Sequence, residues 1–290
     1  MTAGPATAER VAVPEAPDGA TWDVLVVGGG TAGLVGARTA ASFGASVLMV
    51  EHDRPGGDCL WTGCVPSKAL LAAASAAADA RAAAALGVHV GGVRVAFDEV
   101  MGHVRGAIAT IEPVDSADAM RAAGVAYASG SATFTGPGSA RVDGTPVRFR
   151  QALIATGSDP TVPPIPGLAD ADPLTSDSVW HLIERPDRLV VLGGGTVGCE
   201  LGQAFARLGS TVTIVEALDR VLANEDADAA RLVTAALTRD GVTVLTGTPV
   251  TAVEGTDVVL DDGRLITADR VLVAVGRRPD TRGLGLDAAR

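Results

Sequence analysis

The chain has 290 residues, 47% of them apolar, which suffices for about two domains with cores of their own. It carries 23 Lys and Arg against 34 Asp and Glu, a formal net charge of −11. Because no basic patch or arginine-rich run stands out, nucleic acid and anionic membrane surfaces are poor candidates for partners. The longest apolar runs are short and interrupted by Gly, so we expect no membrane span.

The N-terminal segment is rich in Ala, Pro and small polar residues and has no apolar signal region. We therefore expect residues 1–21 to form a flexible leader and the protein to be cytoplasmic. In that compartment a pair of cysteines is usually kept because it reacts.

Residues 22–27 form an apolar, β-branched run that predicts a buried parallel strand. The glycine motif 28–33 follows at once, then an Ala-rich helix, and then a second strand that ends at Glu51. Its three glycines would allow a tight turn, the approach of a pyrophosphate, and close packing of helix on strand; in that order they are Gly28, Gly30 and Gly33. Glu51 is placed to accept hydrogen bonds from a ribose, so the stretch predicts a dinucleotide-binding βαβ unit.

The chain then repeats this unit. A strand at 189–192 leads into the motif Gly193-Gly194-Gly195-Thr196-Val197-Gly198, and a second strand at 211–215 ends at Glu216. Ten of the 24 aligned positions in 28–51 and 193–216 are identical. Two dinucleotide sites in one chain are therefore predicted.

The remaining segments predict supporting elements. Residues 67–86 predict an Ala-dominated helix, and residues 97–121 predict a second helix. The run 159–173 holds five prolines and predicts a linker. Residues 242–266 suggest a small antiparallel meander.

The motif Gly-Gly-Asp-Cys-Leu-Trp-Thr-Gly-Cys-Val-Pro-Ser-Lys at 56–68 carries Cys59 and Cys64 in a glycine-rich loop. Pro66 suits the first turn of a helix, which places Cys64 near a helix N-terminus, where the thiolate is favoured. A reversible Cys59–Cys64 disulfide is one interpretation. A structural disulfide, a zinc site and two inert buried thiols are alternatives that this loop alone leaves open.

Together these parts resemble the two-dinucleotide flavoprotein disulfide reductases, the family of dihydrolipoamide dehydrogenase, glutathione reductase and mercuric reductase. The most specific match is the cysteine motif, which is similar to the family's redox-active disulfide with its following lysine. The resemblance implies an α/β fold with two Rossmann-like domains. These are an FAD-binding domain at 22–158 and an NAD(P)-binding domain at 159–276, with 277–290 beginning the return to the first.

The resemblance also implies which residues hold each cofactor. Those expected to bind FAD are Gly28, Gly30, Gly33, Glu51, Gly57, Lys68, Ala132, Thr156, Gly157 and Ser158. Those expected to bind the nicotinamide cofactor are Gly193, Gly195, Gly198, Glu216, Val250 and Gly276. The acid at Glu216 favours NAD over NADP because a 2′-phosphate would meet a negative charge, although Arg220 lies nearby. No metal site is expected.

The catalytic residues implied by the resemblance are Cys59, Cys64, Lys68 and Glu200. In the family's chemistry a hydride passes from NADH to the flavin, electrons reach the disulfide through Cys64, and Cys59 exchanges with a small-molecule or protein-bound disulfide. Lys68 is expected to pair with Glu200, and Cys199 to be a small buried hydrophobe. Dihydrolipoamide is the first substrate hypothesis, and a mercuric-reductase-like acceptor is the second.

The sequence also departs from the family pattern. Trp61 and Thr62 replace the commoner pair between the cysteines, and Thr196 stands where some members carry an aromatic residue over the flavin. Family members, which form homodimers, continue into a further FAD-binding motif and a dimerisation domain with a His-Glu pair. We therefore expect residues 1–290 to be an incomplete enzyme. A nucleotide-binding fragment without turnover, or a nucleotide sensor, is the competing hypothesis.

Overall fold

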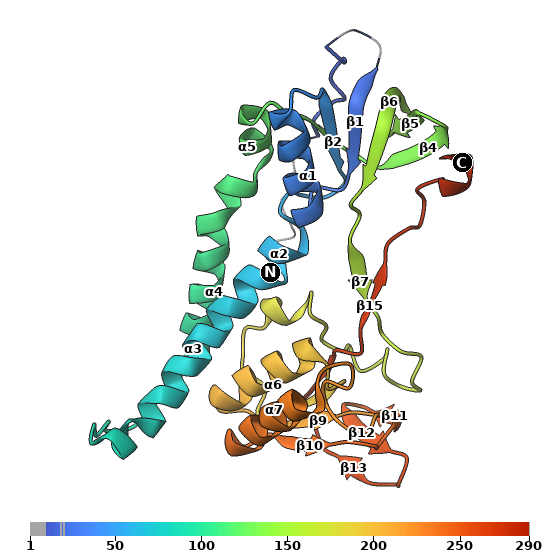
Figure 1. Cartoon of the computed structure of the whole chain (residues 1–290). Helices are drawn as coiled ribbons and strands as arrows, with labels where there is room; N and C mark the ends of the chain where they lie inside the picture. Colours follow the sequence, from blue (N-terminus) through green and yellow to red (C-terminus); the bar gives the residue numbers. More distant parts are fainter. Residues whose placement is uncertain (1–9, 18, 20, 290) are drawn as a thin grey trace. The chain divides into compact units, whose positions relative to one another are not determined.

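The computed structural model describes residues 10–17, 19 and 21–289 (Figure 1). The chain divides into two compact α/β units. The first comprises Met1–Trp61, Ile108–Asp159 and Pro279–Arg290, and the second comprises Thr62–Ala107 and Pro160–Arg278. The cofactor domains expected at 22–158 and 159–276 stay predictions. In the structure, residues 62–107 belong with the second unit, where α3 (Cys64–Ala82) packs against α6 (Thr196–Arg207).

The first unit is built on a six-stranded sheet with the order β3-β2-β1-β6-β5-β4. Its strands are β1 (Trp22–Val27), β2 (Val47–Glu51), β3 (Ala126–Ser129), β4 (Ala132–Gly136), β5 (Ser139–Val142) and β6 (Thr145–Ile154). Strands β1, β2 and β3 run parallel, and β6 pairs parallel with β1 but antiparallel with β5. The buried runs of β1 and β2 are those expected of parallel strands covered on both faces.

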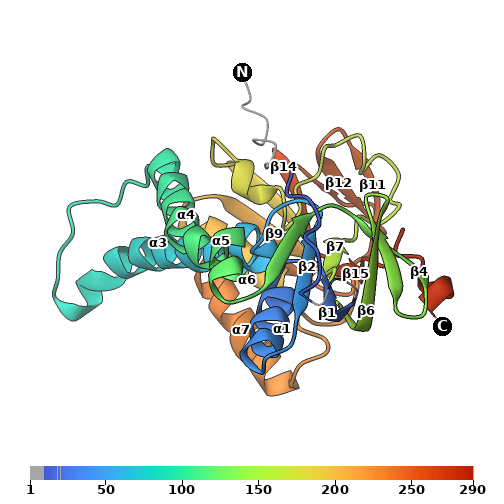
Figure 2. The same ribbon diagram turned by 90° about the horizontal axis from the view of Figure 1, so that it is seen from above.

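Alternation along β1 divides the core of this unit between the two faces of the sheet. Leu25 and Val27 pack with the β4–β5 hairpin, and Val26 packs with Leu34 and Ala37 of α1 (Thr31–Ser42). Figure 2 shows α1 beside β1 and β2, where it covers the second of these faces. The layers therefore follow from the period of two in the strand and the Ala-rich face of the helix.

One predicted helix is wrong. The stretch 97–121 forms α4 (Phe97–Ile111), the 3₁₀ turn η2 (Glu112–Asp115) and α5 (Ala117–Ala122). Pro113 interrupts the helix, and the Ser116 side chain then accepts a hydrogen bond from the Ala119 N–H and caps a new one.

The segment expected to be a flexible leader contacts the first unit in its described part. The carbonyl of Val11 accepts a hydrogen bond from Ser129 N at the end of β3. Val11 and Val13 are partly buried and pack against the two cores of the unit. Residues 1–9, 18 and 20 lie outside the described residues.

The second unit contains a four-stranded parallel sheet with the order β10-β9-β8-β14. Its strands are β8 (Arg188–Leu192), β9 (Thr211–Val215), β10 (Thr243–Leu245) and β14 (Arg270–Val273). The helices α6 (Thr196–Arg207) and α7 (Ala227–Arg239) form the connections after β8 and β9.

The meander predicted at 242–266 is correct only in part. Strands β11 (Val250–Glu254), β12 (Asp257–Leu260) and β13 (Leu265–Ile266) form an antiparallel sheet. The beginning of that stretch, β10, instead joins the parallel sheet beside β9. It does so because α7 carries the chain across the sheet in a β9-α7-β10 crossover.

Two helices at the start of the second unit complete it. Helix α3 (Cys64–Ala82) continues into η1 (Ala83–Leu86) and packs against α6, and Phe97 of α4 lies with its ring centroid 6.1 Å from that of Phe205. By length and composition the helical run Gly57–Leu86 could cross a membrane, a test that core helices also pass.

The proline-rich segment 159–173 is not a loose connection. Leu168 is fully buried in the core of the second unit, and Pro166 O accepts a hydrogen bond from Val253 N. The strands β7 (Ser158–Pro160) and β15 (Arg277–Pro279) pair where the chain leaves and re-enters the first unit. The 3₁₀ turns η3 (Val179–His181) and η4 (Leu286–Ala289) are the remaining elements.

Candidate functional site

The first glycine loop joins β1 to α1 and leaves no room for a Cβ at its first and last glycines. Gly28 has φ +106, and a Cβ placed on it would lie 2.2 Å from Ala155 O. A Cβ on Gly33 would lie 1.9 Å from Gly28 O. Glycine is therefore required at both positions, for the turn and for the close packing of helix on strand.

The N-terminus of α1 is left without a side-chain cap. Its N-cap residue is Gly30, and the first turn contains no acidic residue. In contrast, α5 and α7 are capped by the side chains of Ser116 and Asp226. Uncapped backbone N–H groups and the helix dipole favour an anionic ligand, so this terminus fits a phosphate group.

Glu51 lies at the carboxyl end of β2 beside this loop and is 6% exposed. Its Oε2 accepts a hydrogen bond from Gly29 N at 2.5 Å, and its Oε1 accepts one from Asp53 N at 2.8 Å. These two bonds fix the carboxylate and leave lone pairs for further donors such as ribose hydroxyls.

The other residues expected around FAD lie in the first unit, except Lys68. Gly57 opens α2 (Gly57–Trp61), and a Cβ on it would lie 2.5 Å from Gly30 Cα. Ala132 is buried at the start of β4. Thr156 and Gly157 follow β6, and Ser158 begins β7; the Gly28 contact to Ala155 O brings this turn next to the first loop.

The second glycine loop repeats the first in detail. Gly193 has φ +105 beside Ala274 O, and a Cβ on Gly198 would lie 2.0 Å from Gly193 O. The N-cap of α6 is Gly195, again without a side-chain cap or an acidic residue in the first turn. Glu216 follows β9, with Oε2 accepting from Gly194 N at 2.7 Å and Oε1 from Leu218 N at 2.9 Å.

Val250 and Gly276 border the second loop through neighbouring residues. Val250 begins β11, close after Thr248, whose N–H donates to Glu216 O at 3.2 Å. Gly276 follows the Ala274–Val275 segment, which lies against Gly193. Both residues therefore lie near the second loop, and their contact with the nicotinamide cofactor stays a prediction.

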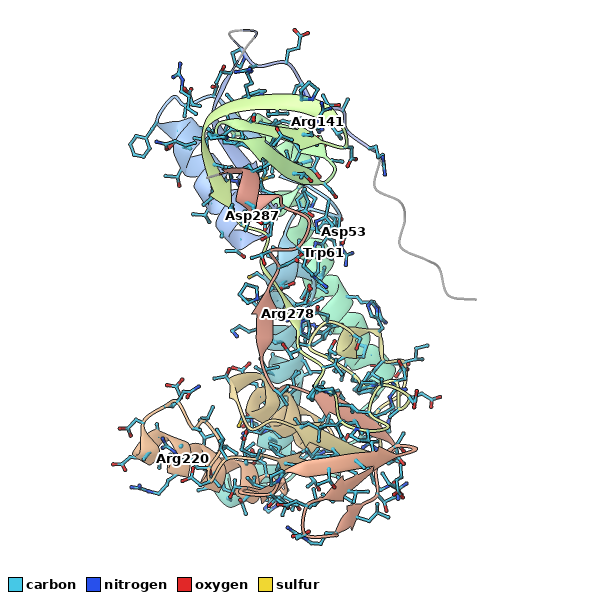
Figure 3. The ribbon with its side chains drawn as sticks, turned by 90° about the vertical axis from the view of Figure 1, so that its right-hand side faces the viewer. Asp53, Trp61, Arg141, Arg220, Arg278 and Asp287 are labelled. Atoms are coloured by element: carbon cyan, nitrogen blue, oxygen red, sulfur yellow. The ribbon has the colours of Figure 1, made fainter. Side chains whose placement is uncertain are left out.

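Arg220, which is labelled in Figure 3, holds the segment that follows Glu216 and lies against the second loop. Arg220 Nη2 donates to Ala223 O at 2.8 Å and to Glu225 O at 3.1 Å. In the same segment, Leu222 N donates to Gly194 O at 2.8 Å, and Val221 is fully buried and lies against Gly194.

The cysteine motif crosses the division between the units, which falls between Trp61 and Thr62. Cys59 is half-buried in α2, and Cys64 is exposed as the first residue of α3, with Gly63 as N-cap. The prediction that Cys64 lies near a helix N-terminus is confirmed. All three cysteines are thiols in the structure.

The expected partners Lys68 and Glu200 are exposed residues of α3 and α6, two helices that pack together in the second unit. No ion pair between them occurs among the described residues, and their pairing stays a prediction. Cys199 is buried, as expected, and its Sγ lies 3.4 Å from Gly194 O. Burial raises the pKa of the Cys199 thiol to about 11, and the charges of Glu216 and Glu200 act in the same direction.

Two contacts of the cysteine loop were not foreseen. Trp61 Nε1 donates to Pro55 O, and Trp180 Nε1 of η3 donates to Thr62 O, both at 2.8 Å. The Trp61 contact is local, but Thr62 and Trp180 are 118 positions apart, so neighbouring residues contain no signal for their contact.

The two glycine loops thus fit dinucleotides by shape, by uncapped helix termini and by fixed carboxylates. The family model for pyridine nucleotide-disulphide oxidoreductases matches residues 22–290. The chain belongs to this family. The family's members are FAD- and NAD(P)H-dependent oxidoreductases. Membership in the family confirms the predicted resemblance and the predicted fold class.

Relatives within this family carry different names. A mercuric reductase from Staphylococcus aureus is 33% identical over 275 residues, which are 92% of this chain and 50% of the relative. A dihydrolipoyl dehydrogenase from Thermus scotoductus is 35% identical over 289 residues, or 93% of this chain and 60% of the relative. The chain therefore spans about half to three fifths of these relatives.

A solved structure supports the same fold. The Cu(II) complex of the HOCl-induced flavoprotein disulfide reductase RclA from Escherichia coli superposes with a TM-score of 0.78 at 28% identity. The match covers 93% of this chain and 59% of that chain.

Proposed function

We propose that this protein is a flavoprotein disulfide oxidoreductase that passes electrons between NAD(P)H and a dithiol or disulfide through Cys59 and Cys64. The observation that carries the proposal is the co-occurrence in one chain of two matching nucleotide loops and a cysteine pair whose second member begins a helix. Family membership supports the same chemistry.

FAD is assigned to the first loop, which lies in the same unit as Cys59. The backbone N–H groups at the start of α1 would face the pyrophosphate, and Glu51 would accept from the ribose. The turn at Thr156–Ser158 and Ala132 would complete the site.

The nicotinamide cofactor is assigned to the second loop, with NADH preferred to NADPH. Glu216 is held by Gly194 N and Leu218 N, so its negative charge is fixed at the ribose position. A 2′-phosphate would be repelled there. Arg220 does not counter this because its Nη2 is bonded to carbonyls and its Nη1 is buried.

The cysteines would carry the exchange with substrate. FAD and NAD(P)H, when bound, supply the two electrons that reduce the Cys59–Cys64 disulfide to a dithiol. In the dithiol state, the Cys59 thiolate attacks one sulfur of a substrate disulfide, and the other sulfur leaves as a thiol. Cys64 then attacks the mixed disulfide, which yields the Cys59–Cys64 disulfide and a substrate dithiol that has received both protons.

The α3 N-terminus favours the thiolate of Cys64 because this residue is the first of a 19-residue helix. Dihydrolipoamide is the proposed substrate, and a mercuric ion held by the two thiolates is the alternative. Identity to both mercuric reductases and dihydrolipoyl dehydrogenases lies between 31% and 36%, which does not separate these substrates.

Anaerobic assays of the chain with added FAD test the proposal. Oxidation of NADH, whatever its rate, should depend on oxidised lipoamide and should be lost in Cys59→Ser, whereas Cys199→Ser should retain it. Stimulation by Hg(II) but not by lipoamide would select the alternative acceptor. Failure to bind FAD, or full activity in a Cys59→Ser/Cys64→Ser variant, would contradict the proposed function.

A further inference from the structure

A buried tryptophan of the second unit holds the backbone that leads into α3. Trp180 is 7% exposed, and its Nε1–H is shared between Thr62 O at 2.8 Å and Ser176 O at 2.7 Å. Thr62 stands two residues before Cys64, with only the N-cap residue Gly63 in between. The indole therefore fixes the carbonyl that lies two residues before the helix that begins with Cys64.

The turn that carries Trp180 is itself anchored to the sheet. Leu174 exchanges backbone hydrogen bonds with β14, donating to Val271 O at 2.7 Å and accepting from Val273 N at 2.8 Å. Ser178 Oγ then accepts from Thr175 N at 2.9 Å and closes the turn.

An arginine braces the same turn. Arg277 Nη1 donates to Ser176 Oγ at 2.8 Å and lies 3.1 Å from Asp177 Oδ1. Ser176 is also the second acceptor of the Trp180 indole, so the indole hydrogen bonds to Thr62 from a braced support.

The residue before Thr62 is held separately, within the first unit. Trp61 Nε1 donates to Pro55 O at 2.8 Å, and Arg54 Cζ lies 3.7 Å from the Trp61 ring centroid. Figure 3 shows Trp61 near Asp53, which follows β2 by two positions. Of the three tryptophans in the chain, two hold the segment between the cysteines, and the third, Trp22, lies in β1.

We propose that Trp180 is a positioning residue for Cys64 and sets the thiol–disulfide equilibrium of the Cys59–Cys64 pair; this rests on the proposed function. Holding Thr62 in place when the sulfurs are reduced limits the freedom that the dithiol gains. A restrained dithiol closes more readily, because less chain entropy is lost on forming the disulfide. Removal of the indole N–H should therefore make the disulfide easier to reduce.

The test is the equilibrium of the pair with glutathione, in a Cys199→Ser background that leaves only these two thiols. Two protein thiols react with one glutathione disulfide, which takes up two electrons and two protons to give two glutathione thiols. Trp180→Phe should lower this equilibrium constant about three- to tenfold, the worth of one neutral hydrogen bond. A tenfold change corresponds to about 30 mV in reduction potential.

The matched control is Trp22→Phe, which also removes a buried indole but lies in β1. It should change the constant less than twofold. An unchanged constant in folded Trp180→Phe, or an equal shift in both variants, would overturn the inference. Absence of any Cys59–Cys64 disulfide in the unmodified chain would instead overturn the proposed function.

A measurement without substitution at Trp180 covers the case in which that variant does not fold. In protein labelled with ¹⁵N-tryptophan, the Trp22→Phe and Trp61→Phe variants assign two indole signals and leave the third to Trp180. The Trp180 indole N–H should exchange slowly with solvent and its signal should move when the pair is oxidised. Rapid exchange, or a signal indifferent to oxidation, would contradict the inference.

Discussion

The two glycine loops share a fingerprint but differ in what covers them. In the first unit Gly29 O accepts from Gly56 N, directly before α2 and its Cys59. In the second unit Gly194 O accepts from Leu222 N, in the segment between β9 and α7. The same loop chemistry is thus joined to a redox motif in one unit and to an arginine-braced loop in the other.

A second difference lies inside the helices. The position of buried Leu34 in α1 is taken by buried Cys199 in α6, and that of exposed Val35 by Glu200. The duplicated units keep the atoms that would face a nucleotide and change those around them. The comparison teaches that binding is common to both loops, whereas their separate roles come from neighbouring residues.

The largest expected effect tests the glycines that both loops share. Gly33→Ala or Gly198→Ala would place a Cβ about 2 Å from a backbone carbonyl oxygen. We expect a loss of about 1–3 kcal/mol in the free energy of unfolding and loss of the nucleotide from the altered loop. Chemical denaturation and separate FAD and NADH titrations measure both. Gly106→Ala in α4, where a Cβ meets nothing within 4 Å, is the control.

The acids provide the next test. Glu216→Gln should weaken NADH binding about tenfold or more, the effect of losing a hydrogen bond to a charged group. The preference of the second loop for NADH over NADPH should become smaller. Glu51→Gln should weaken FAD binding by a similar factor and leave NADH binding unchanged. Calorimetric titration with each nucleotide distinguishes the loops. Equal weakening of both nucleotides by either variant would contradict their separate assignment.

The Cys199 position predicts a pH dependence that Leu34 cannot have. The pKa of its thiol is raised to about 11, chiefly by burial. Between about pH 9 and 11 the unfolded chain has released this proton and the folded chain has not. The contribution of Cys199 to the free energy of unfolding therefore falls as pH rises, by up to about 1.4 kcal/mol per pH unit.

Urea denaturation of the unmodified chain and of Cys199→Ala at pH 8 and pH 10 isolates this term. The difference between the two proteins should shrink at pH 10, because the variant lacks the titrating thiol. A difference that is the same at both pH values would mean that the Cys199 pKa is not raised.

The smallest expected effect concerns the segment around Arg220, which lies against the second loop. Arg220→Met removes two hydrogen bonds to carbonyls but also a buried Nη1 that has no partner among the described residues. The net cost should be about 1 kcal/mol, with weaker NADH binding and unchanged FAD binding. Arg231→Met, on α7 with an exposed ion pair, is the control and should change neither.

Local patterns predicted the parts of the fold whose signals are local. Strands β1 and β9 have the predicted bounds, because a glycine turn follows the apolar run of β1 and an acid follows that of β9. The break in 97–121 was missed because the apolar pattern continues past Pro113, although Ser116 restarts the helix. Strand β10 was misassigned because its pairing with β9 depends on the crossover by α7.

The candidate site was predictable to a similar limit. Motifs in which each residue has a fixed spacing predicted the glycines, Glu51, Glu216 and a helix N-terminus near Cys64. The hydrogen bonds from Gly29 N to Glu51 and from Gly194 N to Glu216 depend on the folded structure and cannot be predicted from spacing. The contact of Trp180 with Thr62 was unpredictable because it depends on how η3 packs in the second unit.

Differential alkylation tests the central claim most directly. The chain with FAD is oxidised, exposed anaerobically to NADH, and alkylated, and modified cysteines are located by mass spectrometry. We predict that NADH makes Cys59 and Cys64 reactive together, two thiols for each two electrons, while Cys199 stays unmodified. Cysteines whose alkylation is indifferent to NADH, although FAD is bound, would contradict the account.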